Sequence, residues 1–309
     1  TEGGKMKQFT GICRILLTSA VILAAILHSA RAEENSSSSS MKNVSSSSSA
    51  VPGQIISTIE DMNVSALEKK FSLTAVLTSE SNLEKESSHT DESSATLELL
   101  PSYRVSSKAK VAALIAAQRD LSGLQETKLL NTTLYLRRDP IALNEDSAFS
   151  LTLQGLLPTE ERARQESSLE GGVGGIVKVD YKFSSFKKPS TVSYSLNTFK
   201  YVHDFDRNTS REANISYRFR NIVTYDVELS KKYSFSFAAY FQSGFTYDNV
   251  AREIFYLEQG LSYAIDSKFS VALLHSTSGS AFEKNGKDWN VEAYDSHNSS
   301  LAASLTYVY

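Results

Sequence analysis

The sequence contains few of the residues that cross-link small secreted domains or build thiolate metal centres. Among 309 residues there is one cysteine, Cys13, one tryptophan and only five prolines. A single thiol cannot form an intrachain disulfide, and it cannot supply the several thiolates that a structural zinc site needs. We therefore expect no disulfide framework, no metal site and no cofactor.

The sequence also has no apolar run long enough to cross a membrane as a helix. The longest run, 15–27, has 13 residues, whereas about 20 are needed to span a hydrocarbon core of ~30 Å. It follows a basic segment and precedes Ala30 and Ala32, which have the spacing of a signal cleavage site. We expect residues 1–32 to be a signal peptide that starts at Met6, after a short upstream extension.

Basic residues are too few for a nucleic-acid-binding protein. Residues 1–32 hold four basic residues and one acidic residue, so their removal leaves 28 basic and 34 acidic residues, a net charge of −6. The removed segment also contains Cys13, so the exported chain has no thiol. An acidic chain does not offer the positive surface that the phosphate backbone attracts, and we expect no nucleic-acid partner.

From Phe71 onward, apolar residues recur at every second position. The clearest stretch is 233–243, in which Tyr233, Phe235 and Phe237 alternate with small polar residues. A helix would spread these rings around its circumference, whereas a strand places them on one face. The pattern recurs in twelve segments of roughly ten residues. It predicts an all-β protein.

Short and long connections largely alternate between the segments, which is typical of hairpins that project to opposite sides of a barrel. The short connections include 106–108, 231–232 and 266–268, and the longer ones include 80–93, 204–211 and 280–297. The connection 139–146 is an exception, because it is longer than the other connections expected on the side of the short hairpins. Several segments reach 11–15 residues, longer than the ~5–6 of soluble sheets. This length favours a barrel over a β-sandwich, the alternative with the same alternation.

The last ten residues resemble the C-terminal strand of Gram-negative outer-membrane β-barrel proteins. Those chains end in an aromatic residue with apolar residues at alternate positions before it, and here the positions are Leu301, Ala303, Leu305, Tyr307 and Tyr309. The resemblance implies a porin-like, transmembrane antiparallel up-and-down β-barrel of about 12 strands over 71–309, with periplasmic termini. It also implies that Leu305, Tyr307 and Tyr309 form the signal read by the barrel-assembly machinery.

Residues 33–70 precede the expected barrel. Two runs of five serines, 36–40 and 45–49, predict a flexible linker. Ile55, Ile59 and Met62 then recur at helical spacing, so a short helix is expected within 54–70. This helix either packs at the barrel mouth or plugs the lumen.

If the apolar parity faces lipid, the opposite parity faces the lumen. Twelve charged residues have lumen parity: Glu98, Arg104, Lys110, Arg137, Lys178, Asp180, Lys182, Arg218, Arg220, Asp226, Glu228 and Glu258. A further polar set is expected there: Gln118, Asn131, Tyr135, Gln154, Asn197, Tyr240 and Gln259. An Arg or Lys facing lipid at midplane would cost ~2–4 kcal/mol, which supports the parity assignment. A lumen this polar offers no place for an aromatic core.

These lumen charges predict a narrow, weakly selective pore for small hydrophilic solutes, because seven basic residues nearly balance five acidic ones. Twelve strands enclose less space than the ~16–18 of general porins. The alternative is a closed structural barrel in which the charges pair across the lumen. The expected partners are outer-membrane lipids and lipopolysaccharide, the barrel-assembly machinery and small solutes, with a homo-oligomer left open.

An outer-membrane barrel enzyme of the phospholipase type is a further alternative. Enzymes of that type use a histidine and a serine on the lipid-facing side. His275 has outward parity, but Ser276 points to the other face, and no nearby Asn orients the imidazole. Thr277 shares the face of His275 but is an unusual nucleophile. We therefore expect no enzyme and no catalytic residues.

The glycine-rich run 171–175 leads directly into a strand without the Lys-Ser/Thr of a phosphate-binding loop. We expect its glycines to let the strand bend or to relieve crowding against a neighbour. Aromatic residues near the expected strand ends, among them Tyr103, Tyr225 and Phe245, are typical of a membrane interface.

Overall fold

A computed structural model describes residues 70–83, 93–122, 125–281, 290–294 and 298–309. The expected signal peptide with Ala30 and Ala32, and the expected serine-rich segment with its helix up to residue 69, lie outside the described residues. No helix within the described ranges is long and apolar enough to cross a membrane.

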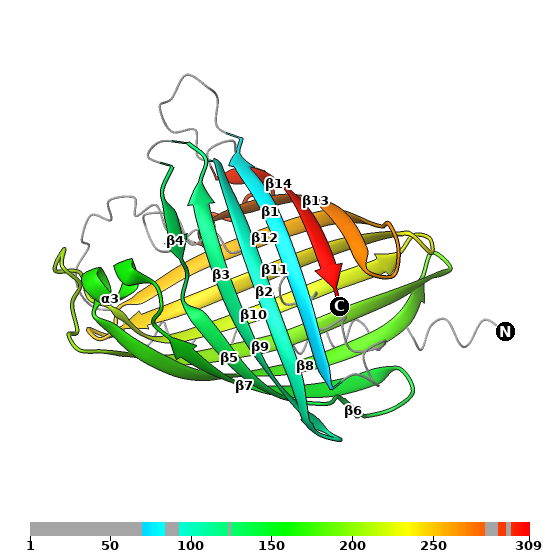
Figure 1. Ribbon diagram of the computed structural model, residues 1–309, viewed down its shortest axis with the longest axis horizontal. Coiled ribbons are helices and arrows are strands. Elements are labelled where there is room, and N and C mark those ends of the chain that lie inside the picture. Colours follow the sequence, from blue (N-terminus) through cyan, green and yellow to red (C-terminus); the bar gives the residue numbers. More distant parts are fainter. Residues whose placement is uncertain (1–69, 84–92, 123–124, 282–289, 295–297) are drawn as a thin grey trace. The chain divides into compact units, whose positions relative to one another are not determined.

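Antiparallel strands form one sheet that closes on itself (Figure 1). Successive long strands pair with each other, and β1 pairs with β14, so that the last strand joins the first. The strands are β1 (Phe71–Asn82), β2 (Ser93–Ser106), β3 (Ala109–Asp120), β4 (Thr127–Leu129), β5 (Thr132–Arg138), β6 (Ile141–Ala142), β7 (Ser147–Leu157), β8 (Leu169–Ser185), β9 (Lys188–His203), β10 (Ile215–Glu228), β11 (Tyr233–Thr246), β12 (Ala251–Ala264), β13 (Phe269–Ser280) and β14 (Ser299–Val308). The first and last strands are therefore not left as the free edges of an open sheet.

The ring has twelve strands, because β4 and β5 both pair with β3 and occupy one place in it, and the two-residue β6 pairs with β7 alone and lies off the ring. A one-residue register shift separates them: Ala117 faces Leu129, whereas Ala113 faces Leu134. This shift moves the outward positions from odd to even numbers, so that Leu129 and Leu134 both face outward. The prediction of an all-β, up-and-down barrel of twelve strands is confirmed.

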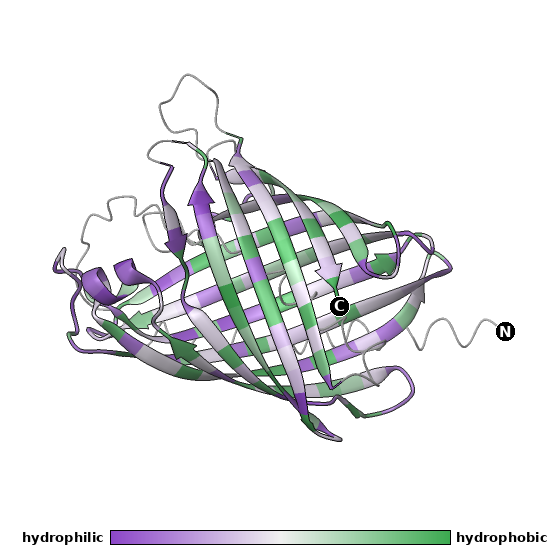
Figure 2. Cartoon of the chain, in the orientation of Figure 1, coloured by the Kyte–Doolittle hydropathy of each residue, from purple (hydrophilic) through white to green (hydrophobic). Residues whose placement is uncertain are grey.

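Hydrophobic and hydrophilic residues alternate along many of the strands (Figure 2). One face exposes large apolar residues such as Leu77, Leu97 and Ile115, and the other holds buried polar residues such as Thr74 and Glu98. Since the barrel is closed, the exposed apolar face is the outside and the polar face lines the lumen. A barrel in water would bury its apolar face, so this arrangement is that of a barrel surrounded by lipid.

The lumen nevertheless contains a small aromatic core. Ile222, Tyr240 and Tyr256 are buried together, with Ile254 packed against them. The Tyr240 and Tyr256 rings stack with centroids 4.8 Å apart and planes inclined by 11°. The expectation that a polar lumen offers no place for such a core was wrong. That expectation counted each inward tyrosine as a polar residue. The strand pairing instead brings Ile222, Tyr240 and Tyr256 side by side on β10, β11 and β12.

Two connections carry structure of their own. Within 139–146, β6 pairs with β7, which accounts for the unusual length of this connection. The charged run after β7 forms the helix α3 (Glu161–Ser167). The Thr209 N–H donates to the Glu166 carbonyl at 2.8 Å and the Asp204 N–H to that of Ser168 at 2.9 Å. These bonds join α3 to the β9–β10 connection.

Candidate functional site

Strand register places the expected lumen charges on the inward face. Glu98 lies opposite Val76, and Arg220 lies opposite Asn197 and Gln242, all of them inward. Arg137 and Lys178 are buried, whereas Glu228 ends β10 and is exposed. The charged residues therefore differ in solvent exposure and in surroundings. Alternation along the sequence assigns them all to one face and does not reveal this difference.

Four cationic residues lie on one line of register partners that runs from strand to strand across the sheet. Arg104 pairs with Lys110, and Lys110 pairs with Arg137. The line continues through β7, β8 and β9 and reaches Arg220, then Gln242. Residues as far apart in the sequence as Arg104 and Arg220 thus form one cationic row on the lumen wall. The offset between strands creates this row, and the linear sequence does not show it.

Arg104 and Lys178 each have a carboxylate partner. Arg104 Nη1 lies 2.8 Å from Asp139 Oδ2, in the connection after β5. Lys178 Nζ lies 2.9 Å from Asp180 Oδ1, which also accepts a 2.6 Å hydrogen bond from the Ser193 hydroxyl. These ion pairs compensate part of the positive charge on β2 and β8.

Arg218 and Arg220 have different surroundings. The Arg220 guanidinium donates from Nε and Nη2 to Gln242 Oε1 at 2.9 and 2.6 Å, and it lies 4.6 Å from the Tyr240 ring centroid. The Arg218 guanidinium lies 5.5 Å from the ring centroids of both Phe199 and Tyr201. Both arginines are therefore held against aromatic rings on the inner wall.

Two acids, Glu80 and Glu258, lie together on another part of the wall. Glu258 accepts a 2.7 Å hydrogen bond from the Tyr256 hydroxyl. Glu80 accepts a hydrogen bond from Ser300, whose hydroxyl is 2.7 Å from that of Ser276. Glu80 and Glu258 also interact electrostatically. Hydroxyl groups therefore link β12, β13, β14 and β1 into an acidic wall.

Glu80 was missed as a lumen residue, and Gln259 was misplaced. Glu80 was assigned to a loop, although β1 extends to Asn82. It lies an even number of positions from Thr74 and Thr78, so continuing the alternation of β1 would have placed it on their inward face. Gln259 has the parity of Leu257 and Leu261, and the structure places it outside, opposite His275. The prediction that Gln259 faces the lumen was therefore wrong.

A few polar side chains face outward. Lys200 lies in one register row with Val173 and Tyr217, both exposed on the apolar face. Its ammonium is 4.0 Å from the Tyr217 ring centroid, and the residue is three positions from the end of β9. A lysine near the membrane interface costs much less than one at midplane. The alternation of apolar residues in the sequence did not predict that Lys200 faces outward.

The structure supplies the orienting group for His275 that the sequence had seemed to lack. Gln259 Nε2 lies 3.2 Å from His275 Nδ1. His275 Nε2 and Thr277 Oγ1 are buried, and neither has a hydrogen-bond partner in the described part of the chain. They are therefore not bonded to each other, whereas nucleophilic catalysis needs this contact. Ser276 points to the lumen, as expected.

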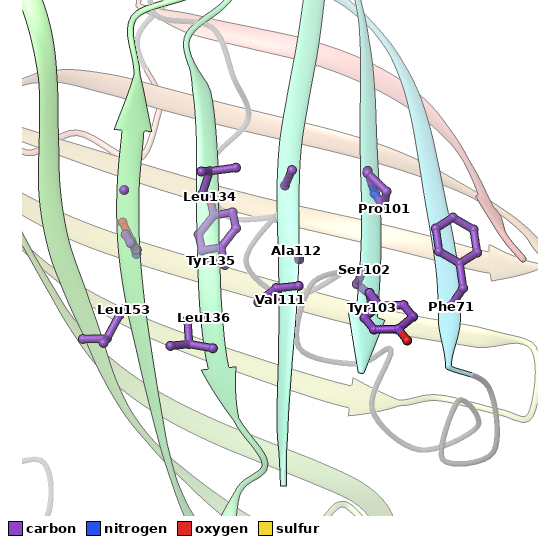
Figure 3. Close-up of a pocket in the computed structure, with 13 residues that line it drawn as sticks. Phe71, Pro101, Ser102, Tyr103, Val111, Ala112, Leu134, Tyr135, Leu136 and Leu153 are labelled. Carbon is purple, nitrogen blue, oxygen red and sulfur yellow. The ribbon is translucent and has the colours of Figure 1, made fainter. Parts of the chain in front are cut away.

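An open apolar groove of about 450 Å³ crosses the outer surface of β1, β2, β3, β5 and β7 (Figure 3). Phe71, Tyr103, Val111, Leu136 and Leu153 are among its lining residues. These side chains belong to the lipid-facing row, so acyl chains are the natural filling, and the groove offers no charged group to a solute. Within the described ranges, no cluster of three metal-ligating side chains occurs.

Comparison with known proteins supports the architecture. No family model matches the chain, and no curated protein matches its sequence. Among solved structures, an outer membrane channel from Pseudomonas putida F1 is 13% identical, with a TM-score of 0.54 over 78% of this chain and 96% of that one. The NanC porin (9% identity, TM-score 0.48) and the KdgM porin (8%, 0.45) each match 76% of this chain and 98% of their own. These two scores are too low to support an inference. The chain therefore has the closed, twelve-stranded antiparallel barrel fold of an outer-membrane channel.

Proposed function

We propose that this protein is an outer-membrane channel that passes small hydrophilic solutes through a narrow pore. The observation that carries the proposal is the division of the lumen wall: a cationic row runs from Arg104 to Arg220, and an acidic wall includes Glu80 and Glu258. Charges of opposite sign on different walls create a field across the lumen, and polar side chains replace part of a solute's hydration shell. The near balance of lumen charges predicts weak selectivity among simple ions.

The setting of the channel follows from its outer face. Exposed leucines and valines favour contact with acyl chains, and the outward aromatic residues near strand ends favour the interface with phospholipid and lipopolysaccharide headgroups. Leu305 and Tyr307 face outward on β14, and the Tyr309 N–H donates to the Leu73 carbonyl at 2.9 Å. We propose that these residues form the assembly signal, after export by the signal peptide, and that both termini are periplasmic.

A closed structural barrel is the second candidate, and the aromatic core favours it. Ile222, Tyr240 and Tyr256 occupy lumen space with buried side chains. This aromatic core narrows the lumen from one wall. Single-channel conductance distinguishes this closed barrel from an open channel.

The deciding experiment is single-channel recording in planar bilayers with refolded protein that lacks residues 1–32. We expect discrete conductance steps, with weak discrimination between potassium and chloride. Unfolded protein in the same detergent is the control. Refolded protein that shows the gel-mobility shift of a folded barrel, yet gives no steps, would establish the closed barrel instead. Repeating the recording without residues 33–70 would test whether that segment enters the lumen.

A further inference from the structure

We propose that Arg218 and Arg220 form a binding site for a small organic carboxylate on the lumen wall. This inference rests on the proposed channel function and names a solute class for it. Weak selectivity among simple ions is compatible with such a site, because a local site acts on a ligand that fits it and not on every ion in the pore.

Arg220 is positioned in advance. Its Nε and Nη2 share one acceptor, Gln242 Oε1, and the Tyr240 ring supports the guanidinium plane. Tyr240 is itself stacked on Tyr256. An arginine has five N–H donors, so most of the donors of Arg220 are not used by Gln242. Binding would therefore not have to order this side chain first, which lowers the entropic cost.

Arg218 is two residues away on the same strand and the same face. It lies against the Phe199 and Tyr201 rings, and its Nε is buried without a hydrogen-bond partner among the described residues. A buried charged donor without an acceptor is costly. An anion on this wall would reduce that cost.

The two arginines have no carboxylate partner in the described part of the chain, in contrast to Arg104 and Lys178. Two like charges on neighbouring inward positions repel each other, and the repulsion is stronger where water is partly excluded. The same sheet provides acids elsewhere, at Asp139 and Asp180. The arginines therefore form a localised excess of positive charge that a bound anion would neutralise.

The chemistry of the site favours a monovalent carboxylate. A guanidinium can bind both carboxylate oxygens at once, and the neighbouring rings offer apolar contact to the rest of a small molecule. Tyr135, on β5, interacts electrostatically with Arg218 and Arg220 but also with Glu98. A nearby acid disfavours a multiply charged ligand such as phosphate.

The test compares gluconate with sorbitol. Gluconate carries a carboxylate where sorbitol carries a hydroxymethyl group. We expect gluconate, but not sorbitol, to block current through single wild-type channels. Arg218→Gln and Arg220→Gln should each raise the half-blocking gluconate concentration about tenfold, the effect of one lost charge-assisted contact. Arg218→Lys and Arg220→Lys keep the charge but lose the planar fork, so they should weaken the block by less.

Two variants control for charge alone. Lys231→Gln removes one positive charge from the exposed β10–β11 connection and should leave the block unchanged. Arg104→Gln removes a lumen charge that is already paired with Asp139. If Arg104→Gln weakens the block as much as Arg220→Gln, the effect is diffuse charge and the proposed site is wrong.

The remaining outcomes separate the two proposals. Conducting channels that gluconate does not block would overturn the site and leave the channel in place. Stronger block by inorganic phosphate would overturn the carboxylate assignment. If the folded barrel does not conduct, calorimetric titration of gluconate into protein in micelles still tests the site. Binding that Arg218→Gln and Arg220→Gln weaken would support it, and no binding by the wild type would overturn it.

Discussion

The ring of Phe199 covers the backbone of Gly174 on the neighbouring strand. The two residues are register partners, and a Cβ atom at Gly174 would lie 2.4 Å from Phe199 Cδ2. At Gly172, a Cβ would lie 2.3 Å from Cε1 of the same ring. Two roles had been expected for the glycine-rich run, and this geometry favours relief of crowding. The glycines make room for a buried aromatic residue in the lumen.

Gly174→Ala should therefore destabilise the folded barrel by about 1–3 kcal/mol, the usual cost of overpacking. Both the Phe199 ring and the Thr198 carbonyl oxygen would have to move, because each lies 2.4 Å from the added Cβ. Urea unfolding of the refolded protein in micelles measures the effect. Gly155→Ala is the matched control, since nothing lies within 4 Å of its Cβ position. Equal stability of the two variants would contradict the crowding explanation.

Tyr240→Ala should increase single-channel conductance. The substitution removes the ring between Arg220 and Tyr256 and opens the aromatic core of the lumen. We expect a stability cost of roughly 0.5–3 kcal/mol. The control is Phe241→Ala, one residue further along β11 on the outward face. A conductance that rises equally in both variants, or in neither, would show that the core does not limit the pore.

Tyr307→Ala should reduce the yield of assembled barrel in cells more than it reduces the stability of refolded protein. The Tyr307 ring packs against Phe269 with centroids 4.9 Å apart, which contributes about 0.5–1.5 kcal/mol beyond area burial. Tyr263→Ala breaks the Tyr233–Tyr263 pair, which has the same centroid distance. If Tyr307 also serves as an assembly signal, only Tyr307→Ala should leave unassembled protein. Equal assembly yields would argue against the signal.

Asp266→Asn should reduce the acid sensitivity of the β12–β13 connection. The Asp266 carboxylate accepts hydrogen bonds from the Lys268 and Phe269 N–H groups at 2.7 and 2.9 Å, and these bonds lower its pKa. The stabilisation is thus complete above the unfolded-state pKa of about 4 and is lost as the pH falls through the lower folded-state pKa. Urea unfolding at neutral pH and near pH 3 should show a larger loss for the wild type. Parallel losses would contradict this assignment.

The sequence by itself determined the strands and their faces. Side chains alternate with a period of two whatever the neighbours of a strand are, so Tyr233, Phe235 and Phe237 identified an outward row without any tertiary information. The same reasoning found the strand count and most inward charges. It failed where alternation is interrupted or misread, at the shift between β4 and β5 and at Gln259.

Tertiary structure alone decided which inward residues meet. Neighbouring strands are offset, and the offsets accumulate around the ring, so Arg104, Lys110 and Arg137 form one row with Arg220 although a long segment separates Arg137 from Arg220. The same offsets bring Ile222, Tyr240 and Tyr256 together and place Phe199 over Gly174. Alternation specifies a face, whereas only pairing specifies a neighbour, and the pairing of Arg218 and Arg220 with rings and not with acids came from the closed sheet.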